Sequence, residues 1–155
     1  MALRSLLAKE WRLDVNTGTV ALPTWTQVKG MSQFKETIDD STEEDDDFEG
    51  EGWGSDVITQ RKWKLECEGR RKRDDTTPTF TPDAGQQKIL DLGNIVGFEA
   101  TAQIRYYRRD GSPDAWEGNA SVSYKGGGGG VKDLEPFNFD ILGQGKRTAI
   151  ANPAA

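Results

Sequence analysis

The sequence contains no histidine and only one cysteine, Cys67. Without histidine, the commonest general base and metal ligand are missing, which excludes Ser-His and Cys-His triads and standard zinc sites. A single cysteine excludes an internal disulfide and fits a reducing compartment. Period-two alternation places Cys67 on an apolar face, where we expect an inert core thiol. We therefore expect no enzyme and no cofactor.

Long apolar runs are also lacking. No stretch of about 18 apolar residues occurs, so we expect no membrane span. The apolar patch within residues 1–8 is too short for the hydrophobic region of a signal peptide. The 155 residues, with 34% hydrophobic residues and 18 glycines, suit one domain, 1–155. This composition favours a sheet with a thin core and long loops over a helical bundle.

One acidic segment holds more than the whole net charge. The chain has 26 acidic and 20 basic residues, a net charge of −6. Nine carboxylates lie between positions 39 and 51, and without them 17 acidic residues face 20 basic ones, a balance of +3. Such a density of like charge stays solvated, so we expect a long acidic loop at about 29–55. The nine residues are Asp39, Asp40, Glu43, Glu44, Asp45, Asp46, Asp47, Glu49 and Glu51.

Period-two alternation of apolar and polar residues predicts strands in most of the remaining chain. The strands are expected at 11–15, 25–28, 57–67, 98–107, 116–124 and 137–141. The fourth and fifth form a long hairpin around the turn 110–113, and each carries one polar face. Thr81 as cap, Pro82 in the first turn and Gly93 after the last predict one helix, at about 82–92. A basic loop is expected before this helix, at about 69–79, with Arg70, Arg71, Lys72 and Arg73.

Several motifs could carry chemistry, but for each of them another interpretation is favoured. The segment 45–56 partly matches a calcium loop, but its fifth position is Glu49 and its twelfth is Asp56, so a solvated loop is favoured. The stretch 143–148 is similar to a phosphate loop, but Asp140 stands where the template needs a glycine and Arg147 where it needs Ser or Thr, which discards nucleotide binding. The basic cluster could bind nucleic acid, but the acidic total favours contact with an acidic segment of another copy.

Five tryptophans could form a face for stacking sugars. Trp11, Trp63 and Trp116 lie on apolar strand faces, where core packing is the usual reason. Trp53, between two glycines beside the acidic segment, is the best candidate for an exposed interface anchor. We therefore expect contacts between copies at Asp39, Asp40, Glu43, Glu44, Asp45, Asp46, Asp47, Phe48, Glu49, Trp53, Arg70, Arg71, Lys72 and Arg73.

The order of elements resembles a major tail tube protein of long-tailed, siphovirus-type bacteriophages. The phrases that carry the resemblance are W-x-x-V-x-G at Trp25, Val28 and Gly30, the long acidic loop, T-x-x-x-W from Thr59 to Trp63, and the hairpin IVGFEATAQIRYYRRDGSPDAWEGNASVSY. The resemblance implies a β-sandwich or half-barrel flanked by one α-helix. It also implies hexameric rings stacked into a tube, in the virion tail, after assembly in the host bacterial cytoplasm.

The resemblance further implies partners: a tape-measure protein, a tail terminator, a distal tail protein and passing DNA in transient contact. The acidic loop would contact a neighbour at Arg70 to Arg73 or at the strand around Arg61. Which polar face lines the lumen stays open, because Arg105 and Lys62 on a lumen wall would attract DNA. The alternatives are a head decoration or tail completion protein, and a module that binds carbohydrate or a host surface.

Overall fold

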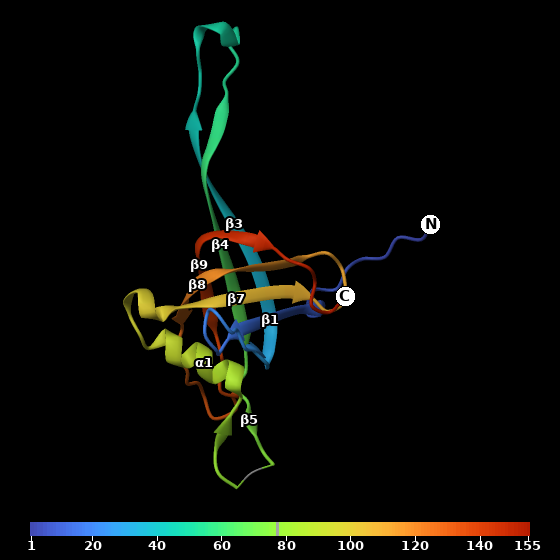
Figure 1. Ribbon diagram of the computed structural model, residues 1–155, viewed down its shortest axis with the longest axis vertical. Helices are drawn as coiled ribbons and strands as arrows, with labels where there is room; N and C mark the ends of the chain where they lie inside the picture. Colours follow the sequence, from blue (N-terminus) through green and yellow to red (C-terminus); the bar gives the residue numbers. More distant parts are fainter. Residues whose placement is uncertain (77) are drawn as a thin grey trace.

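The computed structural model describes residues 1–76 and 78–155, which form a β body with one helix and one long projection (Figure 1). The chain runs through β1 (Trp11–Asn16), β2 (Trp25–Gln27), β3 (Met31–Glu44), β4 (Asp56–Gly69), β5 (Arg73–Asp74) and β6 (Thr81–Pro82). It continues through α1 (Ala84–Gly93), β7 (Thr101–Arg108), β8 (Ala115–Tyr124) and β9 (Phe139–Ala149). The expected mainly β fold with one helix is confirmed.

Seven strands form one antiparallel sheet in the order β2-β1-β7-β8-β9-β4-β3, and β5 pairs with β6 alone. The sheet curls back on itself, because Trp11 of β1 stacks on Phe34 of β3 with ring centroids 5.3 Å apart. These two strands lie near opposite ends of the strand order, so the contact closes the half-barrel. The core fills the space that the curled sheet and α1 enclose.

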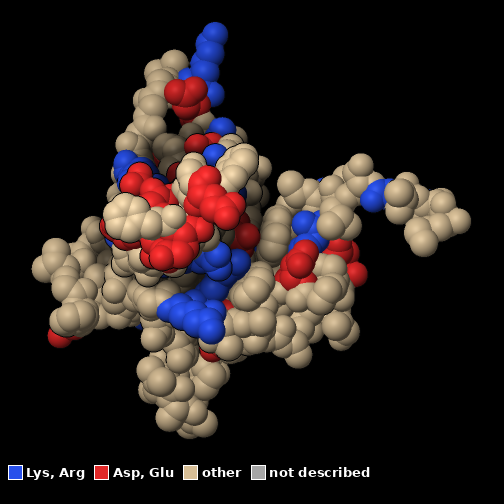
Figure 2. All heavy atoms as spheres, turned by 90° about the horizontal axis from the view of Figure 1, so that it is seen from above, with Lys and Arg blue, Asp and Glu red and all other residues tan. Residues whose placement is uncertain are grey.

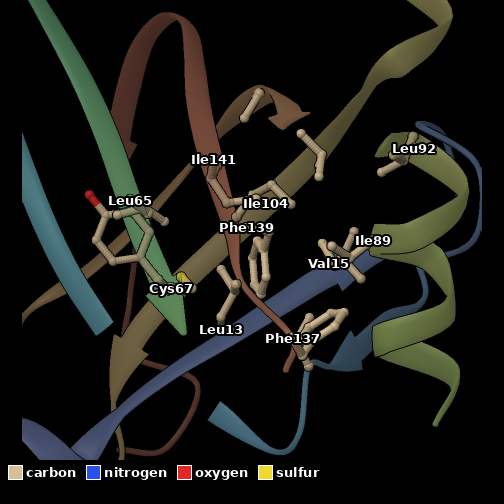
Figure 3. Packing of buried hydrophobic residues seen from close by; sticks show 14 of the residues in the cluster. Leu13, Val15, Leu65, Cys67, Ile89, Leu92, Ile104, Phe137, Phe139 and Ile141 are labelled. Atoms are coloured by element: carbon tan, nitrogen blue, oxygen red, sulfur yellow. The ribbon is translucent and has the colours of Figure 1, made fainter. Parts of the chain in front are cut away.

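Alternation decides which side chains enter this core. Leu13, Val15, Leu65, Ile104 and Ile141 are fully buried, and each lies on the apolar face predicted for its strand. Helix α1 adds Ile89 and Leu92 from the side, and Figure 3 shows both pointing toward the strands. The helix begins after Asp83, whose carboxylate accepts a hydrogen bond from the Gln86 N–H, so Asp83 and not Thr81 is the cap.

Three boundaries differ from the sequence predictions. The segment 29–55 is mostly strand: β3 and β4 pair from Met31–Gly69 to Glu44–Asp56, and only residues 45–55 form the tip. Cross-strand pairs of opposite charge, such as Asp40 with Arg61, allow an acidic strand to form. Strand β9 continues to Ala149, beyond the expected end at 141. Strand β7 begins at Thr101 and not at Phe98, which leaves Phe98 exposed.

The expected basic loop at 69–79 also contains secondary structure, since β5 pairs with β6 there. Thr77 lies outside the described residues. Within the described residues, no helix has the length and apolarity that crossing a membrane requires.

Candidate functional site

The β3–β4 hairpin projects far beyond the body and carries the acidic residues (Figure 1). Asp39, Asp40, Glu43 and Glu44 lie in β3, opposite β4. Asp45, Asp46, Asp47, Phe48 and Glu49 lie at the turn that we call the acidic tip, residues 45–55. Figure 2, seen from the end of the projection, shows acidic side chains gathered there with basic side chains around them.

Two aromatic side chains accompany the charges at the acidic tip. Phe48 is fully exposed and Trp53 is 84% exposed. The tip is held by hydrogen bonds within it: the Trp53 N–H donates to the Gly50 carbonyl at 2.9 Å, and the Ser55 N–H donates to the side-chain Oδ1 of Asp46 at 2.6 Å. Its carboxylates form no ion pair within the described residues. Exposed aromatics among unpaired charges are typical of a surface that another molecule covers.

The basic cluster, Arg70 to Arg73, lies beside α1 and runs into β5, at the end of the molecule away from the acidic tip (Figure 1). Gln86 of α1 fixes its backbone. The buried Gln86 Nε2 donates to the carbonyls of Lys29 and Arg70, each at 2.8 Å, and its Oε1 accepts from the Lys72 N–H at 2.8 Å. Sequence reasoning missed Gln86, because nothing in its local pattern distinguishes it from Gln87.

The acidic tip and the basic cluster therefore do not meet within one molecule. Part of the basic cluster already has partners, since Arg73 pairs with Asp75 at 3.1 Å and Arg70 Nη1 donates to the Gly69 carbonyl at 3.0 Å. A contact between tip and cluster would need two copies. Their placement at opposite ends of the molecule is compatible with such a contact.

Sequence reasoning also missed a hollow at the root of the projection, which we call the hairpin-root cleft. It measures about 620 Å³ and opens where β4 leaves β9. Its lining residues are Ile38, Asp40, Arg61, Lys62, Trp63, Trp116, Gly145, Lys146 and Arg147. Lys146 and Arg147 reach it because β9 bulges between Gln144 and Thr148, opposite the single residue Gly118.

The charges of the hairpin-root cleft are unequally paired. The Arg147 guanidinium lies 3.8 Å from the centroid of the Trp116 ring and donates to Glu36 at 2.6 Å. Arg61 pairs with Asp40 at 3.3 Å. Lys62 and Lys146 make no ion pair with any described residue. The cleft therefore combines aromatic surface with two cations that form no ion pair with a described residue.

The face of β1, β7, β8 and β9 that points away from α1 is polar. One row across it contains Asp14, Arg105, Glu117 and Thr148, and the next contains Gln103, Asn119 and Gln144. Asp14 is only 1% exposed, and its carboxylate accepts from Arg105 Nε at 2.9 Å. Arg105 also lies over the Trp25 ring, 4.7 Å from its centroid. The charge of Arg105 is therefore compensated within this polar face.

The sites for small ligands that the sequence left open gain no support. Among the described residues, no group of three or more His, Cys, Asp or Glu side chains could hold a metal ion. Cys67 is buried, and burial, with the nearby Asp140 and Glu66 carboxylates, raises the pKa of its thiol. The stretch 143–148 is strand and bulge in β9.

Comparison with known proteins gives no match to a family model and none to a curated protein sequence. Solved structures do match. The tail of an empty gene transfer agent particle, with C6 symmetry, has a TM-score of 0.67 at 13% identity over 95% of this chain and all of that one. The chain has the fold of a tail tube protein. The SPP1 tail tube agrees, with a TM-score of 0.67 at 11% identity over 96% of this chain and 81% of that one.

The virion of the native gene transfer agent particle contains another such match, with a TM-score of 0.61 at 13% identity over 95% of this chain and all of that one. The expected resemblance to tail tube proteins is thus confirmed for the fold. It covers the projecting hairpin and the helix together with the sheet, since nearly the whole chain is matched.

Proposed function

We propose that this chain is the structural subunit of a phage tail tube, in which six copies close a ring and rings stack into a conduit for the genome. The observation that carries the proposal is the match of 95% of the chain to the subunit of a tail with C6 symmetry. The role is structural and non-enzymatic. It places the protein in the virion tail, with a tape-measure protein, a tail terminator and a distal tail protein as further partners.

Ring closure follows from the exposed edges of the sheet. The sheet ends at β2 on one side and at β3 on the other, and neither outer edge is paired within the described residues. An open strand edge favours pairing with another chain, and closure into a ring removes it. The three-residue β2 leaves part of β1 uncovered as well. Pairing between copies at these edges would build an inner barrel.

The lumen wall in this proposal is the polar face of β1, β7, β8 and β9. Amide and hydroxyl side chains dominate it, and the Arg105 guanidinium that would attract DNA is paired with the buried Asp14 carboxylate. Passing DNA would therefore make only transient contacts. Lys62 lines a hollow together with Gln144 of the second polar row, so it lies at the border of this face.

Stacking in this proposal uses the charged projections. Asp39 to Glu49 and Trp53 contact a basic surface of a neighbouring copy, at Arg70 to Arg73 or at the strand around Arg61. Weak contacts of this kind multiply along a tube by avidity. Complementary charge would also set the register between copies.

Electron microscopy of the purified protein at high concentration, with native mass spectrometry, tests the proposal. Six-fold rings and hollow tubes are the expected result. A strictly monomeric protein that binds glycans would contradict it in favour of a binding module. Closed rings of another symmetry that never stack would favour a head decoration or tail completion protein.

A further inference from the structure

The hairpin-root cleft has two open strand edges. Strands β4 and β9 pair only from Lys64–Leu142 to Cys67–Phe139. Beyond Trp63, β4 leaves with β3 as the projection, whereas β9 stays with β8. Both strands therefore turn backbone groups without a described strand partner toward the opening, which is a geometry that admits another chain segment.

The lining of the cleft selects the chemistry of that segment. Trp63, Trp116 and Ile38 supply apolar surface, and Ile38 is 41% exposed. Of its four cationic residues, Arg61 pairs with Asp40 and Arg147 with Glu36, which leaves Lys62 and Lys146 without an ion pair among the described residues. An occupant that suits this lining carries an aromatic or aliphatic side chain between carboxylates.

The acidic tip has this composition. Phe48 stands fully exposed between Asp47 and Glu49, with Asp45 and Asp46 before it. We propose that the hairpin-root cleft of one copy receives the acidic tip of a second copy. Phe48 then lies against the cleft tryptophans, and the tip carboxylates pair with Lys62 and Lys146.

A tip cannot enter its own cleft while the projection is extended. From Ile38 to Glu44 the strand carries the tip about 20 Å away from the cleft, at about 3.3 Å per residue. Tip and cleft are different surfaces of one chain, so their contact is heterologous and each copy keeps one of them free. Such a contact propagates from copy to copy, which deepens the proposed tube function and rests on it.

Two other pairings fit less well. The basic cluster places Asp74 and Asp75 beside its arginines, and these carboxylates would repel those of the tip. The segment of residues 1–7 exposes Leu3, Leu6 and Leu7, but its one charged side chain is the cation Arg4. Its positive charge matches the sign of the cleft, so the acidic tip is the favoured occupant.

Matched charge reversals test the docking. The double variant Lys62→Glu/Lys146→Glu changes the cleft, and Arg70→Glu/Arg71→Glu makes the same change in net charge at the basic cluster. Phe48→Ala removes the anchor. We expect the cleft variant and F48A to raise the protein concentration needed for tubes at least tenfold, with unchanged melting of the free subunit, and the basic-cluster variant to change it less than twofold. The opposite ranking would overturn the proposal.

A cross-link separates this inference from the proposed function. A photoreactive phenylalanine analogue at position 48 should cross-link, between copies, to residues of the hairpin-root cleft. Such cross-links in a protein that forms no rings or tubes would support the docking and count against the tube function. Tubes without cross-links to the cleft would overturn the docking alone, and cross-links to 70–73 or to 1–7 would identify the basic cluster or another arrangement instead.

Discussion

The indole Nε1 of Trp63 donates a hydrogen bond of 2.9 Å to the carbonyl oxygen of Gly145. The bond joins β4 to the bulge in β9 at the point where the projection leaves the body. The Trp63 ring also lies on the backbone of Gly118 and Gly143, where a Cβ at Gly118 would approach it to 2.9 Å. Trp63 therefore fixes the hairpin root and the floor of the cleft together.

Gly143→Ala should destabilise the fold by about 2 kcal/mol, because an added methyl group would overlap the Trp63 ring and force it to move. Denaturant unfolding measures this change. Gly50→Ala is the matched control, since a Cβ there would meet only Asp47 Oδ1 at 3.7 Å. If G143A were as stable as G50A, the proposed close packing of Trp63 would be wrong.

Gln86→Leu should lower the free energy of unfolding by about 3 kcal/mol. The substitution keeps the volume but leaves the carbonyls of Lys29 and Arg70 and the Lys72 N–H without their partner. Thermal or denaturant unfolding checks the size of the effect. Gln87→Leu on the same helix removes only a contact with Asp91 and should cost well under 1 kcal/mol. Equal costs for the two variants would argue against Gln86 as the anchor of the basic segment.

Local alternation was sufficient to predict the core and six strands, which correspond to β1, β2, β4, β7, β8 and β9. Leu13, Val15, Leu65 and Ile104 face inward because the period of two leaves them no alternative in a strand with one buried face. The helix was predictable because Pro82 and Gly93 signal its two ends, although the cap is Asp83, two residues later than the expected Thr81.

The acidic projection and the hairpin-root cleft could not be predicted in the same way. A run of carboxylates indicates solvation, but whether it is strand or loop depends on the opposite chain, where Arg61 pairs with Asp40. The cleft needs the bulge in β9, and a bulge follows from pairing between distant strands. The burial of Asp14 likewise depends on Arg105, 91 residues away in sequence.

Asp14→Ala should destabilise the protein by about 3 kcal/mol. The Asp14 carboxylate is buried and also binds Arg12 Nε at 3.3 Å and the Tyr107 hydroxyl at 3.3 Å, so its loss leaves two partly buried arginines without this counter-charge. Asp114→Ala, at an exposed position, is the control and should have little effect. Unfolding that is unchanged by D14A would show that the pair adds nothing to stability.

Alkaline pH should weaken the fold through Cys67. Burial raises the pKa of its thiol above the ordinary value of 9.0, because the thiolate is disfavoured in the core. The stabilisation is fully present below pH 9 and is lost as the pH rises above it, because only the unfolded chain then ionises. From pH 7 to 10 the loss from this thiol is about 1.4 kcal/mol. Over the same pH range, the free energy of unfolding of the Cys67→Ala variant should fall by that much less than that of the unchanged protein. Parallel pH profiles of stability for the two proteins would contradict the raised pKa of Cys67.

The acidic tip should be open to proteolysis in the free subunit and protected in the tube. Its backbone is held by few bonds beyond the Asp45 N–H to Ser55 carbonyl contact of 2.7 Å, and its side chains are exposed. A protease specific for glutamate should therefore cut first at Glu49 and Glu51, and mass spectrometry would locate the cuts. The paired strand residues Glu43 and Glu44 provide an internal comparison, because the β3–β4 ladder protects them. Equal resistance of the tip in free and assembled protein would contradict an ordering of the tip by a neighbour.

Cleavage of the tip before assembly should abolish stacking, because Phe48 and the carboxylates of the acidic tip would no longer be held on one continuous hairpin.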